Sequence, residues 1–304
     1  MTATDPTRGR KCEWIGEQAA LKEFAMFTGG TQGQQHIKPL HWYVASRLVL
    51  EGGFRPEEIT PRPPFESFER DGRPWLRYDK EKANGVESTI LGGLKTKDVD
   101  VVVAKPGIGP VFAVSCKGMT KAFRNLTNRM EETIGECTNL HITYPAMVFG
   151  YLFVIRANRL PGSAVSAIEA EGDTPLPQLN LNDIAIDENG ATVESIIRFQ
   201  TVLEELTGRR GIRNDISRYE AIGLALIEIE KGKAGTISQS FPKEESPLRF
   251  ERFFEQLYRR YDERFVYSAP SLKALTGRKL WTLDEAILND PRCAENNYVI
   301  RSES

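Results

Sequence analysis

Residues 97–136 read KDVDVVVAKPGIGPVFAVSCKGMTKAFRNLTNRMEETIGE and hold two apolar runs, VDVVVA and VFAVS, on either side of the turn-rich KPGIGP. Short apolar runs bounded by glycine and proline are typical of strands, so the stretch predicts a strand pair. A helix is predicted over 121–140, because apolar residues recur there at three and four positions. The apolar stripe of this helix consists of Phe123, Leu126, Met130, Ile134 and Cys137.

The remainder of the chain alternates between helical and strand patterns. Helices are expected over 14–27, after Pro39, over 191–206 and over 247–265. Strands are expected at 88–91 pairing with 99–104, at 146–157 as a buried central strand, and at 219–230. Short strands and loops are expected over 55–80, and a long loop over 161–190. This order predicts an α/β fold, a mixed β-sheet flanked by helices.

The composition is that of an ordinary soluble globular protein, with 304 residues, 40% hydrophobic and 27% charged. No apolar run is long enough to span a membrane, and the first residues lack a secretory core, so a cytoplasmic protein is expected. The four cysteines are scattered without a CxxC pair, which speaks against a structural zinc site. A net charge of −2 means that any nucleic-acid surface must come from locally clustered arginines.

Polar residues gather where the two central strands begin and end. Asp98 and Asp100 open the first strand, and Ser115 and Lys117 close the second. Strand alternation puts Ser115 and Lys117 on one face, pointing toward Asp100. The following helix adds Glu131. Two acids and a lysine converging in this way suit the Mg²⁺-dependent hydrolysis of phosphodiesters, in which carboxylates bind the ion and a lysine stabilises developing charge.

The pattern resembles the PD-(D/E)xK nuclease superfamily, with Asp100 as the first acid and Ser115-Cys116-Lys117 as the second motif. Serine replaces the usual second carboxylate. In this respect the chain is similar to the type II restriction endonucleases of the CCGG/CCWGG group, where the motif is (S/T)-x-K and the following helix supplies the missing acid. Thirteen residues separate Lys117 from Glu131, which fits that displaced position.

The resemblance implies a restriction-endonuclease-like core and a sequence-specific double-stranded DNA endonuclease. Asp100 and Glu131 would bind Mg²⁺, Lys117 would orient and activate the water, and Ser115 would line the site. A homodimer would match a two-fold symmetric DNA target. The whole chain, 1–304, would form one nuclease domain. Its parts would be an N-terminal helical extension (1–35), a catalytic core (36–160) and a C-terminal part that completes the core and contacts DNA (161–304).

Candidate DNA contacts lie in two basic segments. The helix after Lys117 carries the first segment, and the turn GRRGIR the second. The members are Lys121, Arg124, Arg129, Arg209, Arg210 and Arg213. Lys121 and Phe123 depart from the arginine and acid of the family pattern, which leaves the recognised DNA sequence open.

Several alternatives to these assignments remain. Asp98, Glu87 or Glu132 could take part in metal binding, and Asp100 with Lys117 could be a plain salt bridge. Glu131 could lie on a solvated helix face, and the GRRGIR turn could be a surface loop. His36 and His41 flank Pro39 and are expected to cap or pack, and Cys116 is expected to pack away from the site.

The alternatives in function are another nuclease of the same fold, such as a defence-system or structure-specific enzyme, and a non-catalytic DNA-binding protein with a degenerate nuclease core. The serine in the second motif is the feature that favours the last alternative.

Overall fold

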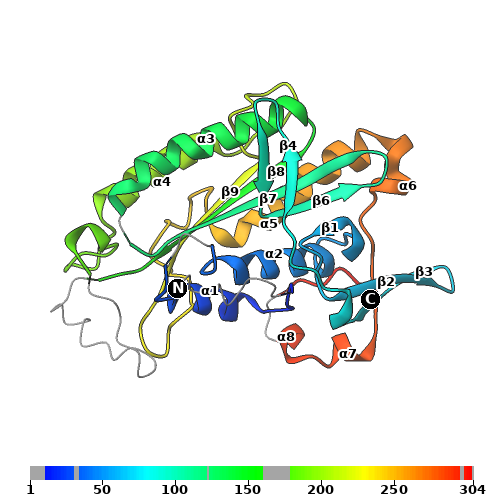
Figure 1. The fold of residues 1–304 in the computed structure, drawn as a ribbon, viewed down its shortest axis with the longest axis horizontal. Helices are drawn as coiled ribbons and strands as arrows, with labels where there is room; N and C mark the ends of the chain where they lie inside the picture. The colour runs from blue at the N-terminus through cyan, green and yellow to red at the C-terminus, as the bar shows by residue number, and fades with distance from the viewer. Residues whose placement is uncertain (1–10, 31–33, 122, 160–178, 295–297, 303–304) are drawn as a thin grey trace, which may run out of the picture.

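The computed structural model describes residues 11–30, 34–121, 123–159, 179–294 and 298–302 (Figure 1). Most of the loop expected over 161–190 therefore lies outside the described residues. Within these ranges, none of the helices combines the length and the apolarity that crossing a bilayer requires.

A five-stranded mixed sheet runs through the centre of the molecule in the order β1-β6-β7-β8-β9. Its strands are β1 (Ile59–Thr60), β6 (Val101–Lys105), β7 (Gly109–Met119), β8 (Val148–Arg156) and β9 (Ala221–Ile227). The pairs β1–β6 and β6–β7 are antiparallel, whereas β7–β8 and β8–β9 are parallel. Every residue of β8 is buried, which confirms the central strand predicted over 146–157.

Helices cover both faces of this sheet (Figure 1), which confirms the α/β fold with flanking helices. One face packs on α1 (Glu17–Ala25), α2 (Lys38–Leu50) and α5 (Phe250–Tyr261), and the other on α3 (Leu126–Thr143) and α4 (Glu194–Leu206). Strand β7 contributes to both cores by alternation. Val114 and Cys116 belong to the core under α2 and α5, and Ala113 belongs to the core under α3.

Two smaller β-sheets lie outside the main sheet. In one, β2 (Phe65–Arg70) and β3 (Arg73–Tyr78) form a hairpin that β10 (Thr282–Leu283) extends. Asp71 and Gly72 connect the hairpin with φ values of 53° and 72°, the conformation that Asp-Gly favours in tight turns. The other small sheet pairs β4 (Ser88–Leu91) with β5 (Thr96–Val99).

The β4–β5 hairpin corrects the pairing predicted for Ser88–Leu91. Its partner is Thr96–Val99, with Ser88 opposite Val99, and not the whole of 99–104. The chain bends at Asp100, so that β5 and β6 belong to different sheets. Asp98 and Asp100 therefore do not share one strand.

Short helices complete the described structure. They are α6 (Lys273–Thr276), α7 (Glu285–Leu288), α8 (Pro291–Ala294), one π-helical turn η6 (Asp262–Tyr267), and the 3-10 turns η2 (Pro56–Glu58), η3 (Lys80–Lys82), η4 (Phe123–Asn125), η5 (Leu181–Asp183) and η7 (Pro270–Leu272). The turn η4 precedes α3, so the α-helix begins at Leu126 and not at Lys121 as predicted.

Candidate active site

Asp100 is a buried carboxylate at the bend between β5 and β6, with 3% of its surface exposed. Its Oδ2 atom accepts hydrogen bonds from Lys117 Nζ at 2.8 Å, from the Cys116 backbone N–H at 2.8 Å and from Ser115 Oγ at 3.2 Å. The antiparallel register of β6 and β7 sets Val101 opposite Val114, and one step further it sets Asp100 opposite Ser115. The structure thus brings together Asp100, Ser115 and Lys117.

A second carboxylate reaches this cluster from α3. Glu136 is 5% exposed, and its Oε2 atom lies 3.1 Å from Ser115 Oγ. The serine hydroxyl carries one hydrogen, so it can donate to Asp100 or to Glu136 at any moment, but not to both. Glu136 Oε1 is buried and has no hydrogen-bond partner among the described residues. Lys97 Nζ lies 3.4 Å from this atom, so Glu136 Oε1 has an ion pair but no hydrogen bond.

Glu136 stands beside Ser115 in place of Glu131, which corrects the prediction for the displaced acid. Glu131 is exposed on α3, and neither it nor Glu136 is among the described residues that line the cleft. Five positions along a helix correspond to about 140° around its axis, so the two glutamates face different directions. The predicted stripe assumed an α-helix from Lys121, whereas the α-helix begins at Leu126 after a 3-10 turn. Ile134 of that stripe is 39% exposed.

His41 and Glu87 complete the surroundings of Asp100. His41, on α2, is 1% exposed, and its Nε2 atom lies 3.8 Å from Asp100 Oδ1. Its Nδ1 atom lies 4.0 Å from Glu87 Oε1. The Nε2 atom is buried without a hydrogen-bond partner among the described residues. His41 is packed as the sequence predicted, and in addition it borders the acid cluster, which the sequence did not indicate.

The pKa values show which groups carry charge. Burial raises the pKa of Asp100, but His41 and Lys117 outweigh burial and bring it below its ordinary value. Burial lowers the pKa of Lys117, but the charges of Asp100 and Glu136 outweigh it and raise the pKa. Burial raises the pKa of Glu136 and of Glu87. Burial lowers the pKa of His41 to about 4, so its imidazole is neutral at neutral pH.

The remaining predicted neighbours lie at the edges of this cluster. Asp98 is exposed and accepts a hydrogen bond from Thr89 Oγ1 at 2.6 Å. Cys116 packs in the core under α2 and α5, and burial raises the pKa of its thiol. Cys116 is therefore a packing residue, but it also lines the cleft and does not lie away from the site as the sequence predicted.

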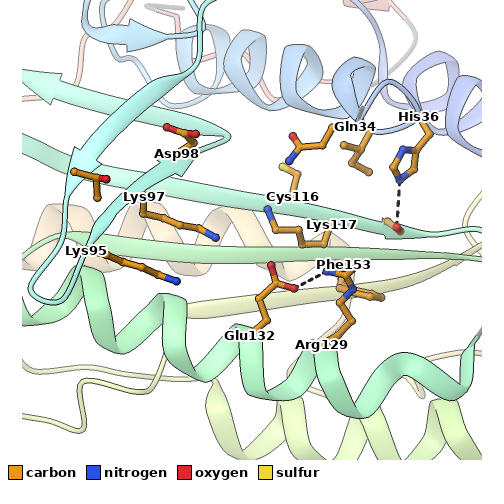
Figure 2. A pocket seen from close by; sticks show the side chains of 13 residues that line it. Gln34, His36, Lys95, Lys97, Asp98, Cys116, Lys117, Arg129, Glu132 and Phe153 are labelled. Carbon is orange, nitrogen blue, oxygen red and sulfur yellow. Dashed lines mark hydrogen bonds and ion pairs between the residues drawn. The ribbon is translucent and has the colours of Figure 1, made fainter. Parts of the chain in front are cut away.

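Lys117 of this cluster lines a cleft of about 550 Å³ between the β4–β5 hairpin, β7 and α3, whereas Asp100, Ser115 and Glu136 lie behind it and are not among the described residues that line the cleft. Figure 2 shows Lys95 and Lys97 from the hairpin, Lys117 from β7, and Arg129 and Glu132 from α3 around the same space. Arg129 and Glu132 form an ion pair on the wall of the cleft. Positive side chains thus come from three different elements, an arrangement that suits a polyanionic backbone.

The residues predicted to contact DNA lie in different places in the structure. Arg129 lines the cleft, and Lys121 is half-buried near the end of β7. The side chain of Arg124 lies outside the described residues. Arg210 and Arg213 are exposed on the loop before β9.

Arg209 is a correction to the predicted set. It is 1% exposed, and its Nη1 atom donates to Glu220 at 2.8 Å. Its Nη2 atom donates to the backbone oxygens of Pro145 and Ile212. Arg209 therefore ties its loop to the body of the molecule and does not face outward. The row of arginines in the sequence does not reveal this difference, because the partner Glu220 lies outside the GRRGIR turn, directly before β9.

Three residues of the site were absent from the predicted set: Glu136, Lys97 and His41. Glu136 could have been found, because it lies four positions before the buried Leu140 and one before the buried Cys137. A charged residue on the buried side of a helix is uncommon unless it is paired or functional. Lys97 and His41 gave no such signal, since only the folding of the hairpin and of α2 brings them to Asp100.

The donor set fits a divalent cation of the Mg²⁺ type. Such an ion takes one or two carboxylates and completes its shell with water and phosphate oxygens. The buried Glu136 Oε1 atom, across Ser115 from Asp100, has no hydrogen bond and only a 3.4 Å ion pair with Lys97, so it is a carboxylate oxygen that such an ion could bind. No group of three or more His, Cys, Asp or Glu residues within the described ranges is arranged to hold a metal by itself, so the fit is limited to two carboxylates.

Comparison with known proteins yields no relative. No protein-family model, no curated protein and no solved structure matches this chain.

Proposed function

We propose that the chain is a Mg²⁺-dependent endonuclease that hydrolyses phosphodiester bonds of double-stranded DNA. One observation carries the proposal: Ser115 Oγ bridges Asp100 Oδ2 and Glu136 Oε2 at 3.2 and 3.1 Å, with Lys117 Nζ at 2.8 Å from Asp100. Two buried acids, a lysine and an open cleft are the groups that this reaction needs.

Asp100 and Glu136 would hold the ion. The chemistry that bound Mg²⁺ supplies is an acidified water and stabilisation of charge on the phosphate and leaving oxygen. Lys117 keeps its proton, because its pKa is raised, and presents a positive charge at the floor of the cleft. It would orient the attacking water and stabilise the phosphate oxygens. Ser115 fixes the two carboxylates relative to each other.

The cleft supports nucleic acid as the substrate. Lys95, Lys97, Lys117 and Arg129 line it, opposed by Asp98 and Glu132. The resemblance to the PD-(D/E)xK nucleases extends the proposal to a type II restriction endonuclease acting as a homodimer on a symmetric site. Glu136 would be the acid that the helix supplies, and in this it departs from the family pattern, because eighteen residues separate it from Lys117 where Glu131 has thirteen.

A non-catalytic DNA-binding protein is the second candidate function. The ion pair between Lys117 and Asp100 favours it. Asp100 Oδ2 already has three donors, as it would in a purely structural salt bridge. The two candidates differ in whether DNA is cut when Mg²⁺ is supplied.

Digestion of a fully sequenced phage genome with Mg²⁺, followed by sequencing of the fragment ends, tests the proposal. We expect ends that share one short sequence. Scattered ends or cut junctions would indicate a defence-system or structure-specific nuclease of the same kind. Intact DNA with Mg²⁺ and with Mn²⁺ would overturn the catalytic proposal.

A matched pair of variants tests the assignment of the second acid. Glu136→Gln should lower the cleavage rate by about a hundredfold or more, because it removes a charged ligand of the ion. Glu131→Gln, on the exposed side of the same helix, should leave the rate unchanged. The opposite result would return the role to Glu131.

A further inference from the structure

Glu136 has a cation of the chain itself as its neighbour. Lys97 Nζ lies 3.4 Å from Glu136 Oε1, the oxygen that has no hydrogen-bond partner. The Lys97 side chain is 23% exposed and the Glu136 side chain 1%, so the ion pair has one buried end and one end at the cleft. The lysine therefore occupies the approach to the proposed cation ligand.

The Lys97 side chain also borders the cleft, so its ammonium group can point there. It lies on β5 of the hairpin and lines the cleft together with Lys95 and Lys117 (Figure 2). A lysine carries its charge on a flexible four-carbon stem, so the ammonium can turn from Glu136 toward the cleft without movement of the backbone. Its contact with Glu136 is longer than the 2.8 Å between Lys117 and Asp100.

We propose that Lys97 exchanges partners. It neutralises Glu136 while the cleft is empty, and it binds a phosphate oxygen when a nucleic-acid backbone enters, which leaves Glu136 to a divalent cation. This inference rests on the proposed role of Glu136 as a cation ligand. It assigns to Lys97 a phosphodiester-binding role and makes cation binding dependent on substrate.

The physical basis is competition for one carboxylate. A divalent cation that reaches Glu136 in the free protein must displace an ammonium, so its affinity is reduced. A phosphate that attracts Lys97 removes this competition. Because linkage is reciprocal, the cation and the phosphate must raise each other's affinity by the same factor.

The first test measures the binding of Mn²⁺ alone to the full chain, by the loss of its electron paramagnetic resonance signal. Lys97→Met should bind Mn²⁺ on the order of tenfold more tightly than the wild type, the range of typical coupling between sites. Lys95→Met is the matched control, because it removes the same charge from the same hairpin without touching Glu136. An equal gain in both variants, or none in Lys97→Met, would overturn the exchange.

The second test measures the binding of a labelled, mixed-sequence DNA duplex in EDTA, where no cleavage occurs. Glu136→Gln releases Lys97 and should bind the duplex more tightly than the wild type. The gain should vanish in the double variant Lys97→Met/Glu136→Gln, which isolates the coupling between the two residues. A gain that persists in the double variant would contradict the proposal.

The same variants separate a failure of this inference from a failure of the proposed function. If Glu136→Gln abolishes Mn²⁺ binding but Lys97→Met does not change it, Glu136 is a cation ligand and only the exchange is wrong. If Glu136→Gln binds Mn²⁺ as the wild type does, both proposals fall. Thermal melting of each variant shows that the fold is intact.

Discussion

Two buried carboxylate clusters lie beneath α3 and differ in how they are satisfied. Glu220 is 1% exposed, and its Oε1 atom contacts Arg209 Nη1 at 2.8 Å and Arg264 Nη2 at 2.6 Å. Its Oε2 atom accepts the Phe149 backbone N–H at 2.7 Å. In the other cluster, Asp100 and Glu136 share one serine hydroxyl, and Glu136 Oε1 has no hydrogen bond among the described residues.

The two clusters differ in the direction in which the pKa of the glutamate is shifted. Burial raises the pKa of Glu220, but His141 and Arg264 outweigh it and lower the pKa to about 2. For Glu136 burial prevails and its pKa is raised. A carboxylate with a short hydrogen bond to each oxygen holds loops and strands together, whereas Glu136, with one shared serine hydroxyl and a 3.4 Å ion pair to Lys97, is less completely compensated for its burial.

The largest effect should come from Lys117. Lys117→Met should lower cleavage by about a thousandfold or more, because it removes the charge that faces the phosphate in a water-poor site. DNA binding measured in EDTA should change far less. Lys273→Met, which removes the same charge from an exposed position on α6 that does not line the cleft, is the control. If Lys117→Met cleaved DNA at the wild-type rate, the cluster of Asp100 and Glu136 would be structural, as the cluster of Glu220 is.

The second effect concerns the stability held by Glu220. Glu220→Gln leaves Arg209 and Arg264 buried with a neutral partner and should lower the free energy of unfolding by about 3 kcal/mol or more. Urea denaturation at neutral pH measures this loss. A loss below about 1 kcal/mol would show that the arginines find other partners.

The decrease in the free energy of unfolding at acid pH should also depend on Glu220. The pKa of Glu220 is lowered from 4.5 to about 2 in the folded protein. Its contribution is therefore fully present above pH 4.5 and is lost as pH falls from there toward 2, a total of about 3 kcal/mol. Denaturation curves of wild type and Glu220→Gln should converge over this window. A constant gap between them would exclude Glu220 as the cause.

The smallest effect is an increase in stability, opposite to the loss expected for Glu220→Gln. Because the pKa of Glu136 is raised, the folded protein holds its charged form less readily than the unfolded chain does. Glu136→Gln should therefore stabilise the protein at neutral pH by about 1 kcal/mol, as is common when a functional charge is removed. Glu131→Gln, exposed on the same helix, should change stability by less than about 0.5 kcal/mol. Thermal melting in EDTA compares the two.

The sequence predicted the grouping of Asp100, Ser115 and Lys117, because strand alternation and an antiparallel turn are short-range rules. It did not indicate that Glu136, and not Glu131, lies beside Ser115. The buried side of α3 carries Thr133, Glu136 and Leu140, and the apolar stripe read from the sequence contained none of these three residues.

Arg209 shows a second limit of the sequence. The GRRGIR turn reads as exposed and basic, and Arg210 and Arg213 are exposed. Arg209 is buried because Glu220 and two backbone oxygens receive its guanidinium. Whether an arginine faces solvent depends on partners that are distant in the chain, and composition carries no record of them.

The sequence by itself determined the order of helices and strands, the buried strand at 148–156, and the acid–serine–lysine motif, because periodicity and local turn chemistry fix these. Only the tertiary structure decided which glutamate faces Ser115, that Lys97 pairs with it, and that His41 borders Asp100. Those choices depend on how α2, α3 and the β4–β5 hairpin pack around Asp100, and a packing angle is a property of the whole molecule.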